Sequence, residues 1–332
     1  MRIFVGVLLV VTAALIYLLG YPEPPVDPTW QVQAHDDVPA GAVTVRFSGT
    51  TTLLFDDGET RWMVDGWFSR PSLARMLFGE IAPDTSAIEA GLSQMGVDTL
   101  AAVIPVHSHY DHAMDAPEVA RRTGAVVIGS AATANIARGG GLPESQIRIV
   151  EDRETVELGQ FRITFYESRH MPYTDPDMVA TLITDSEIPE PLVPPASAFD
   201  YKLGKAYVLH IEHPRGNAML VGSAGFVPGL LEGLDVDVLF LGVGGLGGQT
   251  PEYRQQYWQH TVDAVAPSRL VPVHWDSLTG PLSGPFTGEM RIAALATGGE
   301  QATLDYLTAQ AQKTPQMPFQ TLPRFSKVLL FP

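Results

Sequence analysis

Three imidazoles and one carboxylate lie within six residues near position 110. The run from 107 to 112 reads His-Ser-His-Tyr-Asp-His, and these are groups that bind zinc and other first-row transition metals. In extended backbone the side chains of His107 and His109 point to the same side, so both could reach one ion. Asp111 and His112 follow where the chain turns and could face a second ion. The spacing predicts a metal site, and the alternative is a histidine-rich surface loop without metal.

The neighbouring segments indicate how such a site is positioned. The run follows an apolar segment that predicts a strand over 97–106, and open α/β sheets usually place sites at the carboxyl ends of buried strands. His170 follows a β-type segment at 161–166, and His274 follows another at 269–273. A lone histidine in such a place is more often structural. Beside a preformed cluster, we interpret both histidines as ligands.

From about residue 43 to its end, the chain resembles the metallo-β-lactamase superfamily of metal-dependent hydrolases. The run at 107–112 matches that family's first signature, His170 and His274 match its later histidines, and Asp65-Gly66 matches its early aspartate. The resemblance implies an α/β fold, a four-layer αββα sandwich. It also implies two neighbouring metal positions, one on His107, His109 and His170 and the other on Asp111, His112 and His274.

One position departs from the family pattern. The family usually has an aspartate that bridges the two metals after a hydrophobic strand. Here the strand 218–221 ends in Gly-Ser-Ala-Gly, so Ser223 stands where the bridging carboxylate would be. A hydroxyl is a weaker ligand than a carboxylate, so we expect the second metal to bind more weakly or through water. In overall style the chain is similar to ascorbate-phosphate lactonase-like members and to the phospholipase D that cleaves N-acyl phosphatidylethanolamine, which does not select a substrate.

The chemistry that this resemblance implies is hydrolysis. Bound zinc would make a coordinated water ionise near neutral pH, and the resulting metal-bound hydroxide would attack an ester, lactone or phosphodiester. We expect one or two zinc ions, with manganese or iron as alternatives. Asp111 is the expected catalytic residue, because it would both hold a metal and orient the nucleophile, and Asp65 would orient a ligand histidine. The alternative is a non-catalytic, metal-dependent binding or sensing protein of the same fold.

Composition limits the partners and the number of domains. The 332 residues suit one large α/β domain, and the formal net charge of −16 disfavours binding to nucleic acid phosphates. The chain has no cysteine, so every protein ligand to zinc must be histidine, aspartate or glutamate. A small-molecule or lipid-like substrate remains the expected partner.

The amino-terminal residues have the character of a membrane-targeting segment. Residues 3–19 contain no charge, and Arg2 precedes them, which predicts a signal anchor or transmembrane helix over 1–20. A cleaved signal peptide is the alternative. A proline-rich linker would follow over 21–42, and the hydrolase domain would fill 43–332. This organisation predicts a membrane-anchored protein whose catalytic domain is periplasmic or otherwise extracytoplasmic.

Several other segments invite a functional interpretation. Residues 172–200 contain six prolines and directly follow His170, so they could form a lid over the site or a surface insertion without a catalytic role. The glycine-rich loop at 244–248 lacks the lysine of a phosphate-binding loop. The remaining residues of interest are three histidines that we interpret as structural or non-catalytic, His210, His213 and His260, and three possible substrate neighbours, Tyr173, Trp275 and Asp276.

Overall fold

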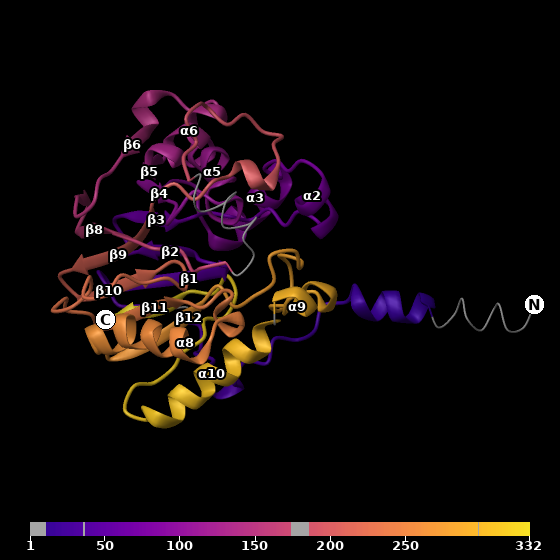
Figure 1. Cartoon of the computed structure of the whole chain (residues 1–332). Helices are drawn as coiled ribbons and strands as arrows, with labels where there is room; N and C mark the ends of the chain where they lie inside the picture. Colours follow the sequence, from indigo (N-terminus) through magenta and orange to yellow (C-terminus); the bar gives the residue numbers. More distant parts are fainter. Residues whose placement is uncertain (1–10, 36, 174–185, 298) are drawn as a thin grey trace, which may run out of the picture.

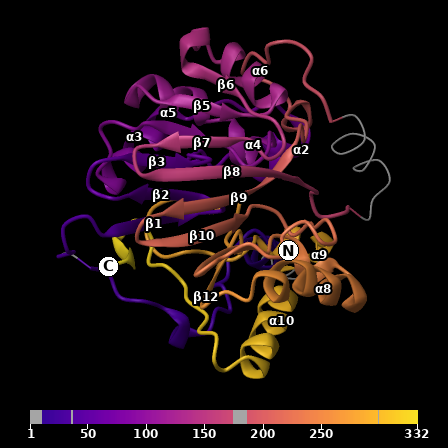
Figure 2. The same ribbon diagram turned by 90° about the vertical axis from the view of Figure 1, so that its left-hand side faces the viewer.

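Two β-sheets pack face to face and form the centre of the molecule. The computed structural model describes residues 11–35, 37–173, 186–297 and 299–332. The first sheet has the strand order β13-β1-β2-β3-β4-β5-β6, and the second has the order β12-β11-β10-β9-β8-β7. Figure 1 shows the sheets between two layers of helices, and Figure 2 shows the strands along their length. The expected four-layer αββα arrangement is confirmed.

The strands of the first sheet come from both ends of the described chain. They are β1 (Val43–Gly49), β2 (Thr52–Asp56), β3 (Arg61–Val64), β4 (Ala102–Ile104), β5 (Val126–Gly129), β6 (Ile147–Ile149) and β13 (Val328–Phe331). The second sheet contains β7 (Thr155–Leu158), β8 (Phe161–Ser168), β9 (Ala206–His213), β10 (Gly216–Val221), β11 (Val238–Gly242) and β12 (Arg269–Val273).

Apolar side chains fill the space between the sheets and beneath the helices. The largest buried cluster lies between the sheets, where the ring of Phe55 meets the edge of Phe240 with centroids 5.7 Å apart. The outer face of the first sheet is covered by α3 (Thr85–Met95), α5 (Ala116–Thr123) and α6 (Ala131–Gly139), and that of the second by α8 (Pro251–Trp258) and α10 (Gly299–Lys313). Strands covered on both faces are apolar throughout, as in β11.

The parallel strands bring distant segments to one edge. β3, β4, β5 and β6 run parallel in the first sheet, and β10, β11 and β12 run parallel in the second. Asp65, His107, Ser223 and His274 lie just past the carboxyl ends of β3, β4, β10 and β12, respectively. This edge is where a site is expected in such a sheet.

One expected element differs in extent. The strand expected over 97–106 is shortened to β4, because Val97 still closes the end of α3 by donating its N–H to the Leu92 carbonyl. The helix α8 begins at Pro251, capped by Thr250, and the chain then changes to π-helical geometry over Gln259–Asp263. The sequence did not predict α9 (Arg291–Thr297), α10 or β13.

The amino-terminal segment is only partly described. Residues 11–18 are helical, and residues 1–10 of the expected anchor lie outside the described residues. Within the described part of the chain, no helix combines the length and apolar character needed to cross a bilayer. The expected linker over 21–42 packs in part against the domain, because Trp30 is buried and Gln31 forms a β-bridge with Thr321.

Candidate metal centre

Six of the expected ligand residues converge on two adjacent positions. One group contains His107, His109 and His170, and the other contains Asp111, His112 and His274. Within each group, one ligand atom from every residue lies within 4.8 Å of the others. The two groups adjoin, because the rings of His107 and His112 have centroids 3.9 Å apart. The structure therefore brings together segments separated by more than 160 residues, as the sequence predicted.

The first group consists of imidazoles from two loops. His107 lies past β4, His109 precedes the short helix α4 (Tyr110–Ala113), and His170 follows β8. His107 Nε2 and His109 Nδ1 are 3.1 Å apart. Burial and the neighbouring imidazoles hold the pKa of His107 and that of His170 well below the ordinary value for histidine. These rings are therefore neutral at physiological pH, as metal ligands must be.

The second group combines one carboxylate with two imidazoles. Asp111 Oδ2 lies 3.4 Å from His112 Nε2 and 3.2 Å from His274 Nε2. Burial alone would raise the pKa of the Asp111 carboxyl, but the imidazoles of His112 and His274 outweigh it and hold that pKa well below its ordinary value. Asp111 is therefore an anion that faces two ring nitrogens.

Asp65 fixes the orientation of His112. Its Oδ2 accepts the His112 Nδ1 proton at 2.8 Å and also accepts the Thr51 hydroxyl, while its Oδ1 accepts the Val106 N–H at 2.9 Å. With Nδ1 engaged, the Nε2 lone pair of His112 is directed at the second group. The sequence predicted Asp65 but not Thr51, whose hydroxyl also lies 2.9 Å from His112 Nδ1. A threonine in a turn gives no sequence signal for partners this distant along the chain.

His274 is held in an unusual backbone conformation. Its φ is +63°, and that of Asp65 is +57°, a left-handed region that costs about 1–2 kcal/mol for residues other than glycine. The His274 N–H donates to the Thr50 carbonyl at 2.6 Å, and the Thr50 N–H donates to Asp276 Oδ1 at 2.6 Å. The turn between β1 and β2 thus supports both histidines of the second group.

Gly244 leaves the space that the His274 ring occupies. A Cβ atom built on Gly244 would lie 2.5 Å from His274 Nδ1. The glycine-rich loop after β11 therefore has a steric role in the site. Its residues 244–248, all of them described, include no lysine that could contact a phosphate.

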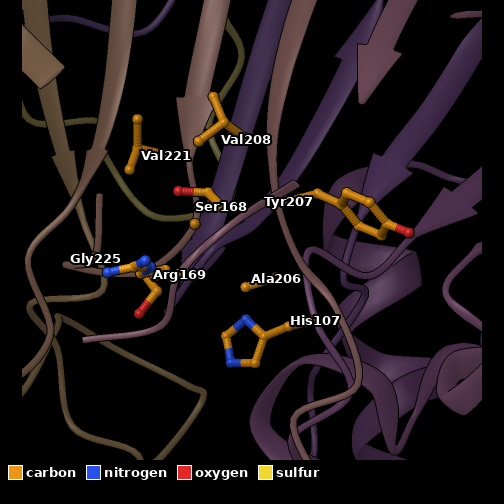
Figure 3. Close-up of a pocket in the computed structure, with 10 residues that line it drawn as sticks. His107, Ser168, Arg169, Ala206, Tyr207, Val208, Val221 and Gly225 are labelled. Atoms are coloured by element: carbon orange, nitrogen blue, oxygen red, sulfur yellow. The ribbon is translucent and has the colours of Figure 1, made fainter. Parts of the chain in front are cut away.

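Ser223 lies beside the first group. Its hydroxyl oxygen accepts the Met171 N–H at 3.2 Å, and the Met171 carbonyl lies 2.8 Å from His170 Nδ1. Ser223 and His107 line one small cavity, which Figure 3 shows with Ser168 and Arg169. The cavity has a volume of about 10 Å³, room for a single water.

The other singled-out residues have varied surroundings. Tyr173 packs against His170 with ring centroids 5.2 Å apart. The Trp275 ring is buried in the core and donates to the Pro272 carbonyl, and its contact with substrate stays a prediction. Asp276 is buried as well and supports Thr50.

The three histidines expected to be structural or non-catalytic stand outside both groups. His210 Nε2 bonds to the Asp235 carbonyl, His213 lies 3.5 Å from Asp57, and His260 stacks on Phe226. The expected lid lies partly outside the described residues, at 174–185.

The residues of both groups fit a divalent metal. Three imidazoles form one donor set, and a carboxylate with two imidazoles forms the other, which are ligand types for zinc, iron and manganese. The facing nitrogens of His107 and His109 would repel if both presented lone pairs with nothing between them. A proton on one ring or a cation held by both nitrogens removes the repulsion, and either accounts for their separation of 3.1 Å.

The chain belongs to the metallo-β-lactamase superfamily, whose sequence profile matches residues 49–265. Among similar solved structures is Igni18, a metallo hydrolase from Ignicoccus hospitalis, with 13% identity, a TM-score of 0.52, and coverage of 87% of this chain and 98% of that one. A possible metal-dependent hydrolase from Veillonella parvula has 12% identity, a TM-score of 0.50, and coverage of 88% and 100%. No protein among the curated sequences compared matches the chain. Family membership and the two ligand groups together define a metal-dependent hydrolase.

Proposed function

We propose that the protein is a zinc-dependent hydrolase that cleaves an ester, lactone or phosphodiester. The observation that carries this proposal is the pair of adjacent ligand groups within one buried edge of the fold. His107, His109 and His170 would hold one ion, and Asp111, His112 and His274 would hold the other. Bound zinc would lower the pKa of a coordinated water to near neutral pH. The zinc would also polarise the substrate oxygen at the group under attack.

The protein's own groups would prepare this chemistry. Asp111, kept anionic by its neighbours, would hold the metal. Its carboxylate would also accept a hydrogen bond from the attacking water and so orient it. Asp65 and Thr51 would keep His112 in the tautomer that ligates through Nε2. A substrate that carries many phosphates is disfavoured by the net charge of −16.

Metal removal and one ligand substitution test the proposal. Hydrolysis of a panel of esters, lactones and phosphodiesters should stop with a chelator and return with Zn²⁺, with Mn²⁺ and Fe²⁺ as comparisons. His109→Ala should abolish hydrolysis, and His260→Ala, which changes a histidine outside both groups, should not. Activity that survives complete removal of metal would contradict the mechanism.

A second candidate is metal-dependent binding or sensing without turnover. Ser223 favours it, because this hydroxyl accepts the Met171 N–H where the family usually supplies a bridging carboxylate. Bound metal measured by elemental analysis, together with no turnover across the substrate panel, would select this candidate over the hydrolase.

We also propose that residues 1–20 anchor the protein to a membrane with the domain outside the cytoplasm. The uncharged run over 3–19 supports it. Protease added to intact cells from which any outer barrier has been removed should digest the domain. Protection until the cells are lysed would place the domain inside.

A further inference from the structure

Exposed large hydrophobic side chains gather on one side of the molecule. Among the described residues, ten such side chains are at least 40% exposed. Five belong to residues 11–19, and the other five are Leu77, Phe78, Val193, Ile292 and Ile149. Figure 1 shows the helix of residues 11–18 and α2 (Leu73–Phe78) projecting on the right-hand side, whereas β6, which carries Ile149, lies towards the opposite side.

The helix α2 has no buried residue and ends in the most exposed of these side chains. Phe78 is 88% exposed and Leu77 is 47% exposed. Single exposed hydrophobic residues are ordinary, but a phenylalanine beside a leucine at the tip of a projecting helix forms an apolar patch. Val193 is 65% exposed and lies three residues before Ala196, which forms a β-bridge with Ile81 just past α2.

A continuous apolar cluster joins this patch to the metal centre. Met76 of α2 and Tyr110 pack against the same buried cluster, which also contains Ala113 and Met114. Tyr110 begins α4, the helix that carries Asp111 and His112. The buried cluster therefore lies between α2 and the helix that carries Asp111 and His112.

The amino-terminal segment is tied to this same side. The Arg291 guanidinium lies 4.4 Å from the centre of the Tyr17 ring and donates to the Tyr17 carbonyl at 3.3 Å. The run over 3–19 has no charge, and its described part is mostly exposed. Two apolar surfaces thus face outward on one side, one of them on a segment long enough to enter a bilayer.

We propose that Leu77, Phe78 and Val193 form a membrane-contacting patch, which enters the interfacial region of a lipid bilayer and turns the metal centre toward the membrane surface. The occupant is a bilayer rather than a second copy, because residues 11–19, the described part of the uncharged run, lie on the same side and the net charge of −16 opposes self-association. The same negative charge selects zwitterionic over anionic lipid. This proposal is independent of the reaction that the site catalyses.

Site-specific labelling of the full-length chain tests the patch. The native sequence has no cysteine, so Phe78→Cys, Ile149→Cys and Ile16→Cys each give a single site for an environment-sensitive fluorophore. Ile149 is the matched control, because it is 42% exposed and distant from the patch. Each labelled protein is mixed with phosphatidylcholine vesicles with and without a lipid-borne quencher. Position 16 reports whether the chain is on the vesicle.

With vesicles, the label at 78 should shift to shorter wavelength and lose at least half of its emission to the lipid-borne quencher, while the label at 149 should not change. A variant with Phe78→Ser and Leu77→Ser should bind vesicles at least tenfold more weakly, because burial of each of these two side chains in the bilayer would favour binding by more than a factor of ten. No quenching at 78 overturns the proposal, whatever position 16 reports, as does equal quenching at 78 and 149. A shift at 78 that follows protein concentration without vesicles shows a second copy instead and also overturns it.

Discussion

Replacement of Asp65 by asparagine should weaken the binding of zinc to the second group and leave the zinc affinity of the first group nearly unchanged. Asp65 is fully buried and accepts three hydrogen bonds, from Val106, Thr51 and His112. Asparagine has the same shape and tolerates the left-handed backbone at this position. It cannot accept all three protons, because one of its two terminal atoms is a donor.

The size of the effect follows from the two ways in which asparagine can sit. If its oxygen still accepts the Val106 N–H, its NH₂ faces His112 Nδ1, which must become an acceptor. The ring proton then moves to Nε2, the atom that faces Asp111, and His112 cannot ligate. If the amide flips, the Val106 N–H is left without an acceptor. Either arrangement costs about 1–3 kcal/mol, so affinity at the second group should fall by about 10- to 100-fold.

The assay is a zinc titration of apoprotein against a competing chromophoric chelator, with the metal content confirmed by elemental analysis. Wild type should show two binding events, and in Asp65→Asn the one assigned to the second group should be about 10- to 100-fold weaker. Asp56→Asn is the control, because Asp56 pairs with Arg61 far from the ligands. Unchanged affinity of both events, or an equal loss from both, would refute the reasoning.

Three further predictions use the same apoprotein and zinc-loaded protein. In Gly244→Ala the new Cβ would lie 2.5 Å from His274 Nδ1 and should displace that ring. Zinc binding at the second group should therefore weaken at least tenfold. An unchanged zinc affinity would show that the loop can move enough to accommodate the methyl group. Ser223→Asp should tighten the second zinc if this position can bridge the metals, and an unchanged affinity would count against the alignment of Ser223. Burial lowers the pKa of His107 and of His170 below the ordinary value of 6.5, so below that pH the unfolded chain takes up protons that the folded apoprotein does not. Their contribution to the free energy of unfolding should therefore fall as the pH drops from 7 to 5.5, by at most about 1.4 kcal/mol per pH unit for each histidine. His112 contributes in the opposite direction, because burial would lower its pKa but Asp111 and Asp65 raise it. In denaturant titrations at several pH values, the free energy of unfolding should depend less steeply on pH for His107→Gln than for wild type, and an equal dependence would mean that His107 is not held neutral.

The convergence of the six expected ligand residues was predictable because the sequence has a strong local signal. The run at 107–112 holds four ligand-type side chains in six residues, and His170 and His274 each follow a recognisable strand. Hydrophobic periodicity likewise located most strands, since they are buried on one or both faces.

The supporting residues were less predictable, because their partners are distant in sequence. Thr51 contacts Asp65 and His112, and Thr50 contacts His274, yet neither threonine stands out in the sequence. The same limit applies to Trp275, which the sequence places beside a ligand, because only the fold shows that its ring is buried. The role of Gly244 is steric and depends on where His274 lies.

The exposed patch on α2 was hidden for a different reason. The segment Leu73–Phe78 has the composition of a buried amphipathic helix, and the sequence does not show that none of its residues is fully buried. Leu73 and Met76 are half-buried, and only full burial is absent from this helix. Burial depends on which elements pack against α2, and that is set by tertiary structure rather than by local pattern.

The most direct test of the account is anomalous X-ray diffraction from crystals of zinc-loaded protein at the zinc absorption edge. The account predicts one peak among His107, His109 and His170, and an adjacent peak, of equal or lower occupancy, among Asp111, His112 and His274. Peaks elsewhere on the chain, or none at either group in fully loaded protein, would contradict it.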